Sequence, residues 1–297
     1  MLRLHPFEFA EPASVVEAVA VLGAANGEAR ALAGGTDLMV DMKLGRMRPR
    51  LLVNLKRIPG LDRIERSEGK TRIGALVPVD AVAASAAVRE GHRALWQGAG
   101  VLGSPPVRHL ATIGGNLGRG SPASDLAPPL VVHGARVLVE GPEGCREIPV
   151  EELHAGPGVT RLAPGEIITA VLLPDPPIRT GTAHGKLGKR GGGWDLALVG
   201  VSVRLTLAEG GEVADARIAL ASVGPTVLRA REAESRLRGR IPTEEALAAA
   251  AEIAAREARP ISDVRASADY RRVLARVLTL RTLTEALGRA REPGAGA

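Results

Sequence analysis

The sequence predicts an α+β protein with small sheets and glycine-rich loops in its first part and a sheet backed by helices in its last part. Three observations predict this class. A capped helix near the start is followed by two short strand patterns. Two hairpin patterns then enclose a long segment rich in Gly and Pro. After Pro174-Asp175-Pro176-Pro177, three strand patterns in succession are followed by three helices, which is typical of an antiparallel sheet covered by helices.

The composition is that of a folded protein with aliphatic cores. The 297 residues suffice for two domains, and 45% hydrophobic and 24% charged residues argue against disorder. Aromatic residues make up 2%, so the cores must consist of Ala, Val, Leu and Ile. Few rings are therefore available for stacking on the bases of single-stranded nucleic acid.

The charge pattern does not favour nucleic acid as a partner. The formal charge is +6, but the Arg residues are mixed with Glu and Asp, and no run of five or six like charges occurs. We expect a solvated surface with protein interfaces, and the basic excess also suits an anionic cofactor such as a dinucleotide.

The cysteine count and the hydropathy pattern indicate a reducing compartment. Cys145 is the single cysteine, which excludes an internal disulfide and an iron–sulfur ligand set within this chain. The first ten residues lack the apolar core of a signal peptide, and no stretch approaches the ~18 apolar residues of a membrane span. We expect a cytoplasmic protein without a membrane span.

The first part, residues 1–55, is predicted as a small subdomain. Ser14-Val15-Val16-Glu17 has the pattern of a capping box, and apolar residues recur at helical spacing to predict a helix over 15–25. A strand over 30–33 leads into Gly34-Gly35, and a second strand is predicted over 51–55.

The second part, residues 56–176, is predicted to contain two hairpins, two helices and a long loop. The strands are predicted over 64–65, 71–76, 135–140, 146–150 and 166–173, with turns at 67–70 and 141–144. Helices are predicted over 79–87 and 92–99. The segment Gly103–Pro129 shows little regular pattern, and a loop of that length in a compact domain usually marks a binding site.

The third part, residues 177–297, is predicted as a separate α+β domain. Its three strands are predicted over 182–186, 197–207 and 212–222. Its helices are predicted over 226–238, 243–259 and 267–287, and the tail from residue 292 is expected to fray.

Two glycine loops are the candidate binding elements. The first, Ala33-Gly34-Gly35-Thr36-Asp37-Leu38, lies between a strand and a short helix. Glycine lets backbone N–H groups approach a phosphate closely, and the Thr36 hydroxyl adds a donor. A purely structural Gly-Gly turn is the alternative interpretation.

The second loop combines glycines with polar side chains. Ala111-Thr112-Ile113-Gly114-Gly115-Asn116-Leu117 is followed by Ser121-Pro122-Ala123-Ser124-Asp125, a mixture suited to diphosphate oxygens and polyol hydroxyls. A pair of polar turns is the alternative.

Several common site types are disfavoured. The chain has no G-x-G-x-x-G opening a helix and no G-x-x-x-x-G-K-[ST], which argues against a Rossmann dehydrogenase and a P-loop NTPase. The six histidines lack metal-ligand spacing, and no G-x-S-x-G nucleophile elbow is present. We therefore expect no metal site and no catalytic residue in this chain.

Three motifs together resemble one family. The run from Leu102 to Asn116, continued by Ser121–Asp125, resembles the second flavin loop of the FAD-binding medium subunits of molybdenum hydroxylases, the carbon monoxide dehydrogenase and xanthine dehydrogenase family. The first loop resembles that family's A-G-G-x-x-L element. Ser262–Arg272 resembles its S-D-x-R-x-S-A-x-Y-R-R run. The resemblance covers about Phe7 to Leu287 and implies a PCMH-type FAD-binding domain of two subdomains before the C-terminal domain.

The resemblance also implies roles for individual residues. Two loops would cradle the pyrophosphate and the adjoining ribityl and ribose groups, namely Leu32, Ala33, Gly34, Gly35, Thr36, Asp37 and Leu38 in one, and Ala111, Thr112, Ile113, Gly114, Gly115 and Asn116 in the other. Asp125 would accept hydrogen bonds from hydroxyls, while Leu102 and Ile168 would pack on the flavin rings. Lys186 would approach the pyrimidine edge of the flavin and stabilise negative charge there, the alternative being a solvated surface lysine.

One segment departs from the family pattern. Lys186–Ala197 corresponds to a K-x-x-R-R-x-G-D-Y-A region, but Leu196 stands where some members have an aromatic residue. Trp194, one residue before Asp195, would then either take over the stacking on the flavin or serve as ordinary packing. Gly191-Gly192-Gly193 suggests a mobile loop that gates access of an electron acceptor.

The resemblance implies an electron-transfer subunit. FAD would be held by this chain, while a large subunit would carry the molybdenum cofactor and a small subunit two [2Fe–2S] clusters, assembled as a dimer of heterotrimers. Electrons would pass from the clusters through FAD to an external acceptor. Two alternatives stay open: a self-contained FAD-dependent oxidase or reductase, and an assembly subunit that no longer binds flavin.

Overall fold

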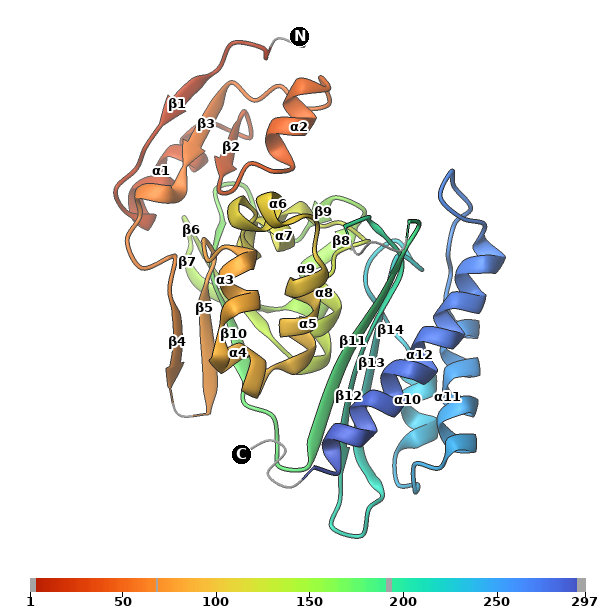
Figure 1. The fold of residues 1–297 in the computed structure, drawn as a ribbon. Helices are drawn as coiled ribbons and strands as arrows, with labels where there is room; N and C mark the ends of the chain where they lie inside the picture. Colours follow the sequence, from red (N-terminus) through yellow and green to blue (C-terminus); the bar gives the residue numbers. More distant parts are fainter. Residues whose placement is uncertain (1–3, 68, 191–193, 293–297) are drawn as a thin grey trace.

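The protein is built from three main sheets with helices between and around them (Figure 1). The computed structural model describes residues 4–67, 69–190 and 194–292. The predicted glycine loop at 191–193 and most of the predicted frayed tail lie outside these ranges. The division of the chain at residues 55 and 176 stays a prediction.

The first sheet forms the upper part of Figure 1. It contains β1 (Glu8–Ala10), β2 (Ala29–Leu32) and β3 (Leu51–Asn54), with β3 in the middle and parallel to both neighbours, and η1 (Leu55–Arg57) follows β3. The connections carry α1 (Val15–Ala24) and α2 (Leu38–Lys43). The predicted cap is confirmed, since Ser14 Oγ accepts from Glu17 N at 3.1 Å, while Glu17 Oε2 accepts from Ala13 N, one residue before the cap, at 2.8 Å. Strand β1 was not predicted.

The central sheet has five strands in the order β4-β5-β10-β6-β7. They are β4 (Ile64–Ser67), β5 (Lys70–Gly74), β6 (Arg136–Gly141), β7 (Gly144–Pro149) and β10 (Ile167–Pro174). Both predicted hairpins are confirmed, as β4 pairs with β5 and β6 with β7, each antiparallel. Residue 68 of the first turn lies outside the described ranges.

Seven helices and a small hairpin complete the central part as the structure describes it. They are α3 (Val79–Ala84), α4 (Ala86–Gly91), α5 (Arg93–Val101), α6 (Pro105–Leu110), α7 (Ile113–Arg119), α8 (Ala127–His133) and α9 (Val150–Leu153), with β8 (His154–Gly156) paired to β9 (Val159–Thr160). The helix predicted over 79–87 is interrupted because Ser85 Oγ accepts from Val88 N at 3.3 Å and starts a new helix.

The prediction of little regular structure over Gly103–Pro129 is wrong, because the segment contains α6, α7 and the start of α8. Local signals start each helix. Prolines occupy the first turn of α6 and α8, where no backbone N–H is needed. Thr112 Oγ1 caps α7 by accepting from Gly115 N at 3.0 Å. Glycine-rich α7 then depends on packing rather than on helix propensity.

The C-terminal sheet has four antiparallel strands, not the predicted three. They are β11 (Thr180–Gly188), β12 (Ala197–Leu207), β13 (Val213–Ala221) and β14 (Leu228–Arg229). β14 lies where the sequence predicted the start of a helix at Thr226. The buried Glu234 carboxylate fixes it by accepting from Ile218 N at 2.9 Å and from Arg229 Nε at 2.9 Å.

Helices cover both faces of this sheet (Figure 1). α5 and α8 lie between it and the central sheet, while α12 (Ala268–Ala290) packs on its other face, beside α11 (Glu244–Glu257) and α10 (Arg231–Leu237). Every residue of β12 is consequently buried. Over the described ranges, the helices are too short or too polar to cross a membrane.

Candidate functional site

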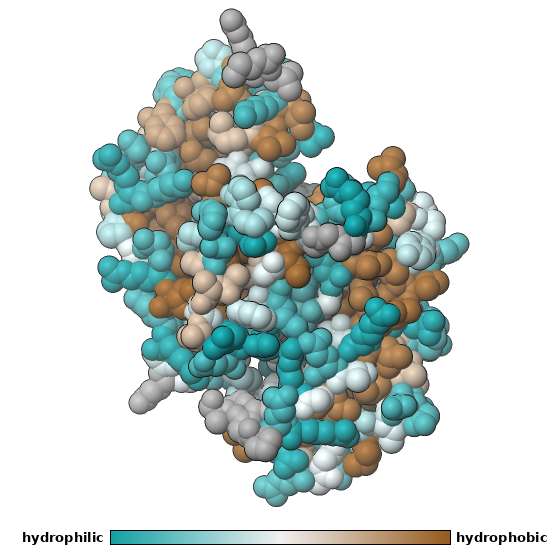
Figure 2. All heavy atoms as spheres, in the orientation of Figure 1, coloured by the Kyte–Doolittle hydropathy of each residue, from teal (hydrophilic) through white to brown (hydrophobic). Residues whose placement is uncertain are grey.

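The two predicted glycine loops meet in the structure, although they belong to different sheets. A Cβ added to Gly34 would lie 1.9 Å from the carbonyl oxygen of Leu110, so the backbone of the first loop touches the end of α6. A Cβ on Gly115 would lie 3.8 Å from the Ala33 side chain. Figure 2 shows the surface hollowed between the upper part, which carries the first loop, and the C-terminal part. The loops therefore form one surface.

The two loops differ in the backbone groups that they offer. Among the described residues, the N–H groups of 34–37 have no protein acceptor. In the second loop, Ile113 N donates to Val77 O at 3.1 Å, Gly114 N to Ala75 O at 2.9 Å and Gly115 N to Thr112 Oγ1 at 3.0 Å. Free backbone donors for an anion thus come from residues 34–37 of the first loop. The N–H groups of 113–115 in the second loop are already bonded within the protein.

Lys186 and Asp125 form a buried ion pair at the junction of the central and C-terminal parts. Lys186 Nζ lies 2.7 Å from Asp125 Oδ2 and donates to Val101 O at 3.0 Å. The two side chains are 3% and 7% exposed. The alternative of a solvated surface lysine is therefore wrong, and β11 contributes a cation to the end of the second loop.

The Asp125 carboxyl is in an unusual electrostatic environment. Burial raises its pKa to about 6, and the neighbouring Lys186 ammonium opposes that shift. Among the described residues, Asp125 Oδ1 is buried without a hydrogen-bond partner. An orphaned buried acceptor is costly, and it is a position where the hydroxyl of a ligand would be favourable.

Leu102 and Ile168 lie in the same hydrophobic core cluster of the central part. Leu102 is 9% exposed at the end of α5, and Ile168 is 6% exposed on β10. Both residues belong to this core, and their contact with flavin rings stays a prediction.

In the segment that departs from the family pattern, Arg190, Trp194 and Leu196 are exposed. Arg190 N donates to Asp195 Oδ2 at 2.7 Å. Trp194 is 68% exposed and Leu196 is 54% exposed. Ordinary core packing of Trp194 is therefore wrong, and its stacking on flavin stays a prediction.

Sequence reasoning missed Arg119, and it named Ser124 only as part of a polar run. Arg119, at the end of α7, lies 3.5 Å from Asp37 Oδ1 through Nε and 3.2 Å from Asp41 Oδ2 through Nη2. Ser124 Oγ donates to Asn116 Oδ1 at 2.6 Å and accepts from Ala127 N at 3.0 Å. The available signal for Arg119 was the spacing of Asp37 and Asp41, which places both carboxylates on one helix face.

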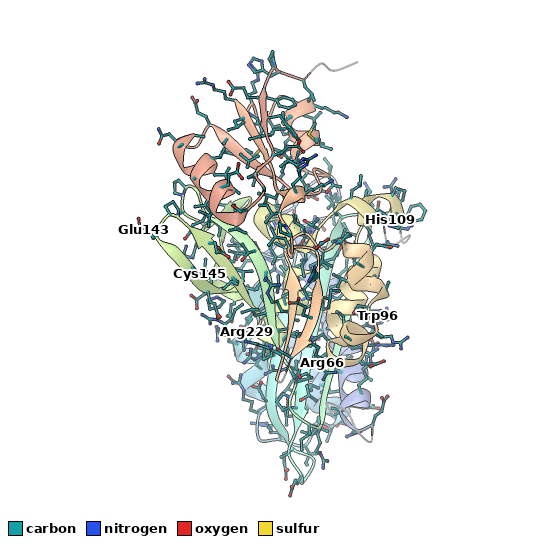
Figure 3. The ribbon with its side chains drawn as sticks, turned by 90° about the vertical axis from the view of Figure 1, so that its left-hand side faces the viewer. Arg66, Trp96, His109, Glu143, Cys145 and Arg229 are labelled. Atoms are coloured by element: carbon teal, nitrogen blue, oxygen red, sulfur yellow. The ribbon has the colours of Figure 1, made fainter. Side chains whose placement is uncertain are left out.

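Figure 3 shows Glu143 and Cys145 at the tip of the β6–β7 hairpin, on the opposite side of the molecule from His109. His109 Nδ1 lies 3.1 Å from Asp80 Oδ2 and its side chain is 64% exposed. His109, on α6, is therefore an exposed partner of Asp80.

Comparison with known families covers nearly the whole chain. Residues 5–176 match the model of the FAD binding domain in molybdopterin dehydrogenase. Residues 185–286 match the CO dehydrogenase flavoprotein C-terminal domain.

Individual relatives agree with these matches. The chain is 36% identical to the carbon monoxide dehydrogenase medium chain of Hydrogenophaga pseudoflava over 95% of this chain and 98% of the relative. It is 29% identical to the xanthine dehydrogenase FAD-binding subunit of Escherichia coli O157:H7, over 96% and 98%. The fold matches a solved carbon monoxide dehydrogenase from Hydrogenophaga pseudoflava with a TM-score of 0.92 and 35% identity, over 96% of this chain and 99% of that one. The chain therefore belongs to the family of FAD-binding oxidoreductase subunits of molybdopterin dehydrogenases, the family of the carbon monoxide dehydrogenase and xanthine dehydrogenase flavoprotein subunits.

Proposed function

We propose that this chain is an electron relay within a larger complex. It receives electrons from the [2Fe–2S] clusters of a small partner subunit and passes them through FAD to an external acceptor. A large subunit with the molybdenum cofactor oxidises the substrate, and the complex is a dimer of such heterotrimers. The names of the relatives support this assembly, since they are medium chains and FAD-binding subunits.

The observation that carries the proposal is the fit of the joined loops to FAD. The free N–H groups of 34–37 suit the oxygens of a diphosphate. Asp125 Oδ1 offers an acceptor to a hydroxyl, and Lys186 supplies a buried cation. When bound, FAD would supply the capacity to accept electrons one at a time from the clusters and to release them singly or as a pair to the acceptor.

The other site residues act by shape in this proposal. Gly114 lets the second loop lie directly on the central part, because a Cβ there would lie 2.6 Å from the Ala75 side chain, and Gly115 faces Ala33 of the first loop. Leu102, Ile168 and Trp194 provide apolar surface for the rings. The residues of this chain thus bind and orient the cofactor, and the organic substrate is held in another subunit.

Absorption spectroscopy of the purified complex tests the relay. We expect flavin bands that persist through gel filtration. Removal of FAD is expected to leave cluster reduction by dithionite intact but to abolish fast reoxidation of the clusters by a quinone or oxygen, and added FAD is expected to restore it. A deflavinated complex that reoxidises at the original rate would exclude the relay.

The same experiment separates the two alternatives. A self-contained oxidase or reductase would turn over a substrate as the single FAD-loaded chain, without clusters. An assembly subunit would leave the well-folded complex without flavin bands.

A further inference from the structure

Arg119 lies at the end of α7, where the backbone is held by hydrogen bonds to the β8–β9 hairpin. Gly120, which follows it, ends the helix with φ of +63°. The Gly120 carbonyl accepts from Gly158 N at 2.9 Å, and His154 Nε2 donates to Leu117 O at 2.8 Å. The backbone that carries Arg119 is therefore fastened to the β8–β9 hairpin and cannot move independently of the central part.

The Arg119 guanidinium reaches across to α2 of the first sheet. It lies 3.2 Å from Asp41 Oδ2 and 3.5 Å from Asp37 Oδ1, two carboxylates one helical turn apart. The Asp41 side chain is 8% exposed and that of Arg119 is 35% exposed, so this contact is shielded more than a surface ion pair. Asp37 makes no capping hydrogen bond to α2, which leaves its carboxylate for Arg119.

These contacts link the two glycine loops a second time. Asp37 belongs to the first loop and immediately precedes α2, while α7 begins directly after Thr112 in the second loop. The first connection is the backbone contact of Gly34 with Leu110, and the second is the ion pair of Arg119 with α2. Two separate contacts therefore hold the first loop and α2 against the segment that contains α6, the second loop and α7.

We propose that Arg119 is a positioning residue that holds the two loops at the spacing required by the diphosphate of FAD. It acts through Asp37 and Asp41 and does not itself contact the cofactor. This inference rests on the proposed function, because it assumes that FAD lies between the loops.

The test is the rate of FAD release from the full chain, purified with the subunits that accompany it. Arg119→Gln is expected to release FAD about tenfold faster, as removal of one partner leaves the buried Asp41 carboxylate poorly compensated and loosens α2. Its flavin reduction potential should equal that of the wild type, because the ring environment is untouched. A shifted potential would contradict a positioning role.

Arg46→Gln is the matched control. Arg46 Nη1 lies 3.5 Å from the other oxygen of Asp41, but its side chain is 67% exposed and it does not reach α7. An exposed pair of this kind contributes little, so FAD release is expected to stay at the wild-type rate. Equal acceleration of FAD release in Arg46→Gln and Arg119→Gln would overturn the proposal.

A double-mutant cycle distinguishes the positioning role of Arg119 from direct binding of the phosphate by Arg119. The positioning role predicts that Asp41→Asn also accelerates FAD release. It also predicts that the double variant, Arg119→Gln with Asp41→Asn, releases FAD no faster than either single variant. The double variant also leaves no unpaired buried charge, so it should fold. Unchanged or slower release in Asp41→Asn would mean that Arg119 binds the phosphate itself and would overturn the proposal. Absence of FAD from the wild-type protein would instead contradict the proposed function.

Discussion

Single residues at this site are constrained by backbone contacts and by charge. Gly34 has no room for a side chain because a backbone carbonyl lies where its Cβ would be. Lys186 is held by an acceptor on each of two segments, Val101 O and Asp125 Oδ2. Both constraints come from atoms distant in the sequence, and each leads to a prediction.

Gly34→Ala is expected to lower FAD affinity by at least about tenfold, because its Cβ would push the first loop away from Leu110. Gly118→Ala is the matched control. Gly118 lies on α7 close to the second loop, and among the described residues a Cβ there would meet nothing within 4 Å. Fluorescence titration with FAD measures both variants. Wild-type affinity in Gly34→Ala would show that the loop contact is unimportant for binding.

Lys186→Ala is expected to lower the flavin reduction potential by about 30 mV or more. Loss of the buried cation removes stabilisation of negative charge, and about 1.4 kcal/mol corresponds to 30 mV for a two-electron couple. Lys189→Ala serves as control, since Lys189 is exposed and donates to Val264 O at 3.2 Å. Redox titration of both variants checks this. An unchanged potential in Lys186→Ala would remove Lys186 from the flavin environment.

At the scale of elements, close packing decides what glycine-rich segments become. α7 has poor intrinsic propensity, yet Thr112 caps it and Gly114 lets it lie directly on Ala75. β11 behaves in the same way against α12. A Cβ on Gly181 would lie 1.9 Å from Ala286 O, and one on Gly185 would lie 3.0 Å from Thr282 Oγ1. These glycines set the distance between strand and helix.

Gly181→Ala is expected to reduce the free energy of unfolding by about 3 kcal/mol, because β11 and α12 must move apart. Gly288→Ala is at an exposed position of α12 where a Cβ would meet no atom of residues 4–67, 69–190 and 194–292 within 4 Å, and it is expected to increase that free energy by about 0.5–1 kcal/mol. Urea unfolding of both variants provides the comparison. Equal changes in the free energy of unfolding in the two variants would mean that β11 packs less closely on α12 than the structure shows.

At the scale of the whole molecule, buried histidines lie between the central and C-terminal sheets. His92 precedes α5, His133 ends α8 and His184 lies on β11, and all three are buried. Burial lowers the pKa of His92 to about 4 and, with Lys186 nearby, that of His184 to about 3. Burial also lowers the pKa of His133, with His92 and Arg204 adding to the shift. The layers are therefore joined by neutral imidazoles.

Acid is expected to weaken this junction. The unfolded chain binds protons on His92 and His184 near pH 6.5, whereas the folded chain does not until near pH 4 or below, so the free energy of unfolding falls as pH drops through that window. His92 and His184 should each lower the free energy of unfolding by about 2 kcal/mol between about pH 7.5 and about pH 5. Urea unfolding of wild type and His184→Gln checks this, and the variant should lose about 2 kcal/mol less over that interval. Identical losses would mean that His184 is not buried in solution.

Part of the fold could be predicted because its signals are local. The Ser14 cap and helical spacing of apolar residues predicted α1. The sequence pattern predicted β12 with its observed bounds, and turn residues predicted both hairpins. The short elements were missed. β1 and β14 have three and two residues, and they exist because β3 and β13 offer them backbone partners. α6 and α7 were predicted as loop because glycine and proline have low helix propensity, and tertiary contacts stabilise these helices instead.

The sequence by itself determined the class of the protein and the two loops, since residue types and their spacing are written in the chain. The tertiary structure decided which loop keeps free N–H groups, that Lys186 is buried against Asp125, and that Arg119 joins α2 to α7. The physical reason is that a pattern reports on neighbours within a few residues, through capping, periodicity and turns. Burial, ion pairing and the satisfaction of backbone groups depend on segments that meet only after the chain has folded.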